Sequence, residues 1–302
     1  MIGRSLARIY AETRDSSPVL SNEISAWMAD LAGDTAPEGY FTDPSAFPML
    51  LAPWWAEETL RTRPDPSFQE KLIFSTLSGY YYVRLIDDLM DGHQTAERSL
   101  LPALGVFHTN FQLPYLRYFP NGHPFWKVFT SSWFGSAEVT LIDSRLSEID
   151  RAQFIDVSAR KTGAARIPVA AVCYRYDSPR LIQRWSEFLD GFGCWHQMWN
   201  DVFDWPRDLR NGTVTYFLSE ADRRRRAGES VAEWVAREGL AWGVEALDEW
   251  MTEVRTLARG LDCPALMEYL GSREEMVREQ AENVGKGLES AAQLTRVLRA
   301  RA

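Results

Sequence analysis

Apolar residues recur at intervals of three and four over most of the chain, which is the periodicity of an amphipathic helix. Val, Ile and Thr are not gathered into short alternating stretches, so strands are not expected. The pattern predicts an all-α chain. The helices are expected, with boundaries good to about three residues, at about 4–14, 22–33, 45–61, 67–91, 96–119, 124–149, 151–176, 179–205, 214–227, 229–260, 264–271 and 273–300.

The expected helix at 67–91 would be about 37 Å long, enough to run through the centre of a bundle. Ser67 stands just before its first apolar residues, where Ser is a favoured N-cap. Elsewhere, no linker rich in Pro, Gly or Ser divides the 302 residues. We therefore expect a single-domain helical bundle over residues 1–302.

Three acids, Asp87, Asp88 and Asp91, end that helix. Spacings of three and four put them on one face, at the helix end that carries negative partial charge. Acids near a core need a partner cation or a metal ion. Arg84 can reach Asp87 or Asp88, but one Arg cannot balance three acids. The motif therefore predicts bound cations, with Asp88 alternatively acting as a partner of Arg84.

A second polar cluster, Asn200, Asp204 and Asp208, is spaced by four and again by four, so its members share a helix face. Mg²⁺ prefers one or two carboxylates completed by waters and phosphate oxygens. Two such clusters suit several Mg²⁺ ions around a diphosphate. Pro206 lies inside this cluster and is expected to remove the hydrogen bond to the Val202 carbonyl and kink the helix.

Two other metal sites are excluded by spacing. An EF-hand beginning at Asp87 would have Leu89 in third place and Arg98 in twelfth, and neither side chain binds calcium. A di-iron bundle needs Glu three residues before His. The residues three before the four histidines are Met90, Gly105, Pro120 and Gly193.

Together, the two motifs resemble those of the class I isoprenoid synthases: the trans-prenyltransferases, the squalene and phytoene synthases, and the class I terpene cyclases. The resemblance spans roughly residues 67–260 as topology and implies an all-α bundle with a central active-site cavity. It assigns Mg²⁺ binding, with three ions, to both motifs, and a prenyl diphosphate as the substrate. The metal ligands so implied are Asp87, Asp88, Asp91, Asn200, Asp204 and Asp208, with Asp87, Asp91 and Asn200 as the catalytic set.

A third segment adds to the resemblance. Lys161-Thr162-Gly163 lies between the motifs, where trans-prenyltransferases carry a Lys-Thr pair that contacts diphosphate. Gly163 would permit a local break in its helix. The diphosphate-binding candidates are Arg160, Lys161, Arg207, Arg210 and Gln197, and the residues expected to line the substrate pocket are Tyr80, Val83, Gly163, Gly193 and His196.

The sequence favours a cyclase within this group. Trans-prenyltransferases usually follow the first motif with an Arg pair, and only Arg98 lies there. Asn200 resembles the cyclases, whereas the acid at Asp204 resembles the prenyltransferases. We therefore expect a Mg²⁺-dependent terpene synthase acting on a C15 or C20 prenyl diphosphate. The alternatives are a trans-prenyltransferase or squalene/phytoene-like condensing enzyme, and a catalytically silent helical partner protein.

The net charge and the spacing of the cysteines indicate which partners and which cellular compartment to expect. A net charge of −9 argues against nucleic acid as the main partner. Cys173, Cys194 and Cys263 are isolated, which predicts a reducing cytoplasm rather than a disulfide framework. Neither a signal peptide nor a membrane span is expected. The resemblance also implies a homodimer.

Overall fold

The computed structural model describes the backbone of residues 1–91 and 97–301, and the side chains of residues 1–90 and 97–287. Over this part of the chain the structure consists of helices joined by turns, without a β-strand, which confirms the all-α prediction. The chain divides into two compact units: Met1–Ser131 with Ala164–Ile182 (unit 1), and Ser132–Gly163 with Gln183–Ala302 (unit 2). The single domain stays a prediction.

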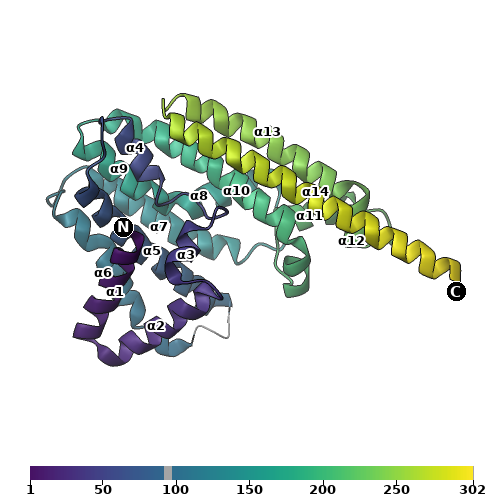
Figure 1. Cartoon of the computed structure of the whole chain (residues 1–302), viewed down its shortest axis with the longest axis horizontal. Helices are drawn as coiled ribbons and strands as arrows, with labels where there is room; N and C mark the ends of the chain where they lie inside the picture. The colour runs from purple at the N-terminus through teal and green to yellow at the C-terminus, as the bar shows by residue number, and fades with distance from the viewer. Residues whose placement is uncertain (92–96, 302) are drawn as a thin grey trace. The chain divides into compact units, whose positions relative to one another are not determined.

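Unit 1 is organised around α5 (Pro66–Asp91), which packs against α1 and α6 (Figure 1). Within unit 1, α1 also packs against α2, and α4 packs against α9. The elements of unit 1 besides α5 are α1 (Ile2–Ser16), α2 (Pro18–Ala32), α3 (Pro37–Thr42), α4 (Ala52–Glu58), a 3₁₀ turn (Arg98–Leu100), α6 (Ala103–Leu116), the first part of α7 (Phe125–Asp143), α9 (Arg166–Arg175) and a 3₁₀ turn (Pro179–Leu181).

The core of unit 1 holds the inner face of α5. Leu77, Tyr81 and Leu85 are spaced by four and are all buried. The Tyr81 ring lies between Trp27 of α2 and Phe107 of α6, at centroid distances of 5.8 and 5.6 Å. Burying a large apolar side chain contributes roughly 1.5–3 kcal/mol. This packing fixes the helix whose C-terminal end carries the first acidic motif.

Unit 2 contains the longest helices. In Figure 1, α13 and α14 run side by side, in agreement with their contacts. The Trp199 indole N–H of α10 donates to Gln280 of α14 over 2.9 Å. The elements of unit 2 are the rest of α7, α8 (Arg151–Lys161), the start of a 3₁₀ turn (Thr162–Ala165), α10 (Ile182–Asn211), α11 (Tyr216–Arg224), α12 (Val231–Trp234), a π-helical turn (Val235–Gly239), α13 (Leu240–Arg259) and α14 (Pro264–Arg301).

Several helix boundaries differ from the prediction. Asp65, not Ser67, caps α5: its carboxylate accepts from the backbone N–H groups of Ser67 (3.0 Å) and Phe68 (3.3 Å). α14 is one helix where two were predicted, because Gly271 is accommodated within it. The break expected at Gly163 is present as the 3₁₀ turn between α8 and α9.

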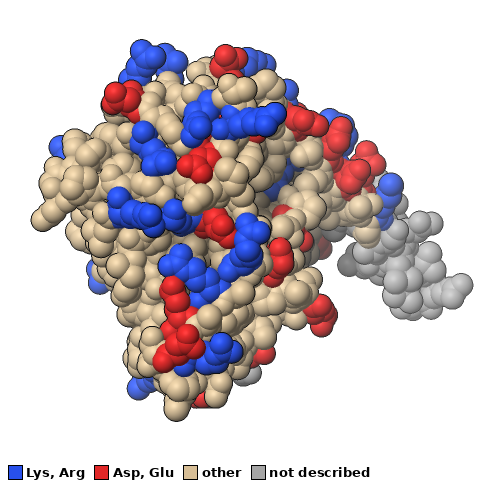
Figure 2. Space-filling view, turned by 60° about the vertical axis from the view of Figure 1, so that its left-hand side comes forward, with Lys and Arg blue, Asp and Glu red and all other residues tan. Residues whose placement is uncertain are grey.

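Charged side chains of both signs are mixed on the surface. On the face that Figure 2 shows, Lys and Arg are interspersed with Asp and Glu. Ion pairs are frequent among the described side chains; Arg4, for example, lies 2.6 Å from Glu70. Exposed pairs of this kind each contribute little to stability. Positive charge on this face therefore occurs largely beside negative charge.

Candidate functional site

Unit 2 contains a cavity of about 240 Å³ beside the C-terminal part of α10. Asn200, Asp204 and Asp208, the predicted second metal motif, all line it. The helix continues through Pro206 to Asn211, so the proline does not separate Asp208 from the other two. The remaining lining residues are Asp143, Ile149, Phe154, Val157, Ser158, Lys161, Gln197, Asp201, Arg207, Thr213, Val214 and Thr215.

Arg207 neutralises part of the negative charge of this cavity. Its guanidinium donates to Asp204 over 2.7 Å and lies 3.5 Å from a carboxylate oxygen of Asp208. Burial raises the pKa of Asp208, Arg207 opposes that rise, and the nearby Asp204 adds to it. Arg207 therefore interacts with two neighbouring carboxylates of the cavity.

The donor set of the cavity fits a hard cation. Asn200, Asp204 and Asp208 offer only oxygen, the ligand type that Mg²⁺ prefers. Among the residues whose side chains the structure describes, no three His, Cys, Asp or Glu side chains converge into a metal site of their own. A Mg²⁺ ion at this cavity would therefore need waters or phosphate oxygens to complete its coordination, as is usual for this ion.

A second basic side chain, Lys161, reaches the cavity from the end of α8. Its ammonium group pairs with Asp143, which lines the same cavity. The neighbouring Arg160 pairs instead with Glu138 and is not part of the cavity lining. Arg210 is exposed and also lies outside the lining. Of the four predicted basic residues, the structure thus brings Lys161 and Arg207 together with the second motif.

Gly163 and Gly193 lie at close packing positions rather than in this cavity. A Cβ on Gly193 would lie 2.4 Å from the Thr162 hydroxyl oxygen, and one on Gly163 would lie 3.2 Å from the Ser136 hydroxyl oxygen. Contacts under 3.0 Å are sterically forbidden without movement of a neighbour. Glycine at 193 therefore allows α10 to approach the Lys161-Thr162-Gly163 segment.

His196 is enclosed by aromatic rings. Its imidazole stacks on Phe192 at 6.1 Å between centroids and meets Trp199 edge-on at 5.6 Å. Burial, followed by the charge of the nearby Arg273, lowers the pKa of His196 to about 3. The ring is therefore neutral at physiological pH. It was predicted to line the substrate pocket, but it is not among the residues that line this cavity.

Asp201 is a cavity residue that the sequence prediction omitted. It accepts hydrogen bonds from the Gln197 amide over 2.8 Å and from the backbone N–H of Tyr216 over 3.1 Å. Burial raises its pKa to about 7, against the effect of these two donors. Asp201 thus orients Gln197 and joins α10 to the start of α11. The spacing of four between Gln197 and Asp201 is a signal in the sequence from which this pair could have been predicted.

The first acidic motif lies in unit 1. Asp88 is buried, with one oxygen 3.0 Å from Arg84 and the other accepting from the Trp27 indole N–H over 3.3 Å. Asp88 is thus paired with Arg84, and its predicted role as a metal ligand stays a prediction. Asp87 is half-buried. The side chain of Asp91 lies outside the described residues, so its predicted role stays a prediction.

Tyr80 and Val83 precede Asp87 on α5, as the helical spacing predicts. The Tyr80 hydroxyl is hydrogen-bonded to the Tyr40 hydroxyl, and its ring meets Phe41 edge-on at 5.2 Å. Burial, followed by the interaction with Tyr40, raises the pKa of Tyr80 well above its ordinary value. The Tyr80 hydroxyl is therefore neutral and lies within an aromatic cluster. Val83, three residues further along α5, is half-buried.

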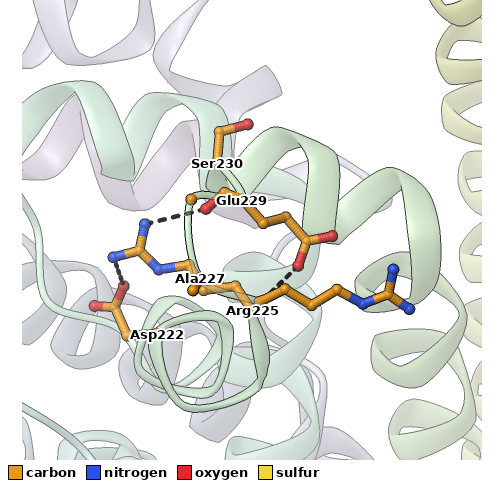
Figure 3. A pocket seen from close by; sticks show the side chains of 7 residues that line it. Asp222, Arg225, Ala227, Glu229 and Ser230 are labelled. Atoms are coloured by element: carbon orange, nitrogen blue, oxygen red, sulfur yellow. Dashed lines mark hydrogen bonds and ion pairs between the residues drawn. The ribbon is translucent and has the colours of Figure 1, made fainter.

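A second cavity, of about 520 Å³, lies at the connection between α11 and α12 (Figure 3). Arg225 pairs there with Asp222 at 2.9 Å and donates to the Glu229 carbonyl over 3.5 Å, and Figure 3 shows its guanidinium between them. The Arg226 backbone N–H donates to the Glu229 carboxylate over 2.8 Å. These interactions give the charged groups of this connection partners within the protein, as expected for a structural turn.

Comparison with known proteins reveals the fold. No family model and no curated protein sequence matches the chain. Among solved structures, it is similar to heptaprenyl diphosphate synthase from Staphylococcus aureus, with a TM-score of 0.60, 10% identity, and coverage of 93% of this chain and 98% of that one. It is also similar to polyprenyl synthase from Caulobacter crescentus CB15 complexed with calcium and isoprenyl diphosphate (TM-score 0.56, 15% identity, coverage 91% and 97%).

The chain therefore has the all-α fold of the class I isoprenoid synthases, as its motifs predicted. At these identities the similarity concerns the fold alone. Within the described part of the chain, no helix has the length and apolar character required to cross a membrane.

Proposed function

We propose that this protein is a Mg²⁺-dependent enzyme that acts on a prenyl diphosphate. The observation that carries the proposal is the cavity of unit 2, where Asn200, Asp204 and Asp208 share one lining with Lys161 and Arg207. Oxygen donors for a divalent cation and cations for a phosphate thus occur together. The isoprenoid synthase fold supports the same function, and the isolated cysteines favour a cytoplasmic setting.

In this proposal, Asn200, Asp204 and Asp208 of unit 2 would hold Mg²⁺, and Asp87 and Asp91 of unit 1 would hold Mg²⁺ at the first motif. Bound Mg²⁺ would neutralise the negative charge of the leaving diphosphate. Asp88 keeps Arg84 in place. Lys161 and Arg207 bind diphosphate oxygens, and Gln197, oriented by Asp201, donates its amide to the same group. In unit 1, the aromatic cluster around Tyr80 would exclude water from a hydrocarbon chain bound there.

Two reactions begin from such a complex. Prenyl transfer or condensation is the better supported, because one similar structure is named a heptaprenyl diphosphate synthase and the other a polyprenyl synthase complexed with calcium and isoprenyl diphosphate. Cyclisation, which the sequence favoured, retains two observations in its support: Asn200 begins the second motif, and Arg98 has no Arg neighbour for a second diphosphate. Either reaction begins with cleavage of the allylic C–O bond.

One incubation separates these reactions. The purified protein is supplied with Mg²⁺ and farnesyl or geranylgeranyl diphosphate, with and without isopentenyl diphosphate, and products are identified by mass spectrometry. A longer prenyl diphosphate that requires isopentenyl diphosphate indicates transfer. Hydrocarbon or alcohol from one substrate indicates cyclisation or head-to-head condensation, which the product's carbon number tells apart.

The matched variants test the site. Asp204→Asn is expected to lower turnover by at least about 100-fold, because metal-assisted charge neutralisation supplies several kcal/mol. Arg225→Gln, which removes an ion pair outside the cavity, is the control. Absence of diphosphate release with every allylic substrate would refute the proposal and favour a silent partner protein.

A further inference from the structure

Both basic side chains that line the cavity of about 240 Å³ beside α10 are paired with acids of the same cavity. Lys161 pairs with Asp143, and Arg207 bridges Asp204 and Asp208. The lining contains four carboxylates in all and these two basic groups. In this state, therefore, the groups suited to a cation and those suited to an anion neutralise one another.

In this arrangement a divalent cation and Arg207 compete for the same carboxylates. A divalent cation and the Arg207 guanidinium would bind the same carboxylate oxygens of Asp204 and Asp208, so each weakens the other's binding. A diphosphate, in turn, offers Arg207 a bidentate partner of higher charge than a single carboxylate. The Arg207 side chain is 60% exposed, which leaves it room to change its rotamer.

We propose that Arg207 is the internal counter-ion of the second metal motif, and that it exchanges Asp204 and Asp208 for a diphosphate oxygen when a divalent cation binds those carboxylates. The inference rests on the proposed function. It makes Arg207 an inhibitor of cation binding before substrate arrives and a substrate ligand afterwards. Cation and diphosphate then favour each other's binding, because each releases a group that the other needs.

Two changes in affinity, one for the cation and one for the anion and opposite in sign, distinguish this role from that of an ordinary surface ion pair. An ordinary exposed pair spaced by three residues on a helix contributes little to stability and nothing specific to either ligand. An internal counter-ion opposes the cation and supports the anion. Removal of Arg207 must therefore strengthen one binding event and weaken the other.

The test compares Arg207→Gln with Arg225→Gln. Arg225 pairs with Asp222 at the same spacing of three residues, over 2.9 Å, so this control removes an equal charge and a similar pair outside the cavity. Affinity for Mn²⁺ alone is followed by the loss of its free-ion paramagnetic resonance signal. Affinity for inorganic pyrophosphate at saturating Mg²⁺ is followed by calorimetry.

Arg207→Gln is expected to bind Mn²⁺ about two- to fivefold more tightly, the range that an exposed ion pair corresponds to. It should bind pyrophosphate more weakly than the wild type, while Arg225→Gln leaves both affinities unchanged. Equal Mn²⁺ affinities of the two variants, or a loss of both affinities in Arg207→Gln, would overturn the inference alone. Failure of the wild type to bind either ligand would instead refute the proposed function.

Discussion

Gly193 is the residue at which the packing beside the Lys161-Thr162-Gly163 segment is least tolerant. An added Cβ would lie 2.4 Å from the Thr162 hydroxyl oxygen and 3.1 Å from the Thr162 methyl carbon. Gly193→Ala is therefore expected to lower the free energy of unfolding by about 1–3 kcal/mol, the usual cost of overpacking. Urea denaturation followed by circular dichroism measures this change.

Gly271→Ala is the matched control for that substitution. Gly271 also lies inside a helix, but its added Cβ would have no atom within 4 Å. Alanine there is expected to stabilise the protein by about 0.5–1 kcal/mol through helix propensity. The double variant Gly193→Ala/Thr162→Ala should recover part of the loss. Equal effects at Gly193 and Gly271 would contradict the packing argument.

Individual site residues were predictable to different degrees. Asp204 and Asp208 share the cavity with Asn200 because a spacing of four keeps them on one helix face, which a sequence alone reveals. Asp143 was not predictable, because it meets Lys161 from another helix, and pairing between helices leaves no local pattern. Asp201 was overlooked because its partners include a backbone N–H, which every residue type except proline offers.

Helices were predicted best where apolar periodicity was long, and least well at their ends. α10 continues as a helix beyond Pro206, because a proline removes one helical hydrogen bond without necessarily ending the helix. α5 is capped by Asp65 rather than Ser67, since both residue types are good caps and only the backbone path selects between them. The short α3 (Pro37–Thr42) was not predicted at all, because six residues carry too little periodicity.

The connection between α11 and α12 leads to a prediction about pH. Both oxygens of Glu229 accept from Arg237, over 2.6 and 2.8 Å, and one also accepts from the Arg226 N–H. The Arg237 hydrogen bonds, followed by that of Arg226, lower the pKa of Glu229 from 4.5 to about 2. Because the folded-state pKa is the lower one, this interaction stabilises the fold above pH 4.5. The stabilisation is lost as the pH falls from about 4.5 to about 2.

Carbon-13 NMR of the glutamate side-chain carboxyl groups measures this titration directly. The Glu229 midpoint is expected near 2 in the wild type and closer to 4.5 in Arg237→Gln. Arg255→Gln, which removes a 2.7 Å pair with Glu274, serves as the control and should leave Glu229 unchanged. An ordinary midpoint for Glu229 in the wild-type protein would show that the Arg237 contact does not persist in solution.

At the scale of the molecule, the fold follows from the order and length of its helices more than from residue identity. The similar structures share 10% and 15% identity with the chain, yet each is covered over nearly its whole length. Buried positions need only apolar residues of suitable volume, so many sequences satisfy one helical arrangement. The same tolerance explains why motif and topology predicted the fold, whereas the choice between transfer and cyclisation needs an assay.

The last prediction concerns whether the two acidic motifs bind separate ligands or the same one. Each of Asp87→Asn and Asp204→Asn is expected to weaken binding of inorganic pyrophosphate in the presence of Mg²⁺. If the motifs act on the same bound group, the double variant loses less than the sum of the single losses, with a coupling free energy of about 0.5–3 kcal/mol. Calorimetric titration of the four proteins completes this cycle. Strictly additive losses would indicate independent sites, because residues without a shared partner do not couple.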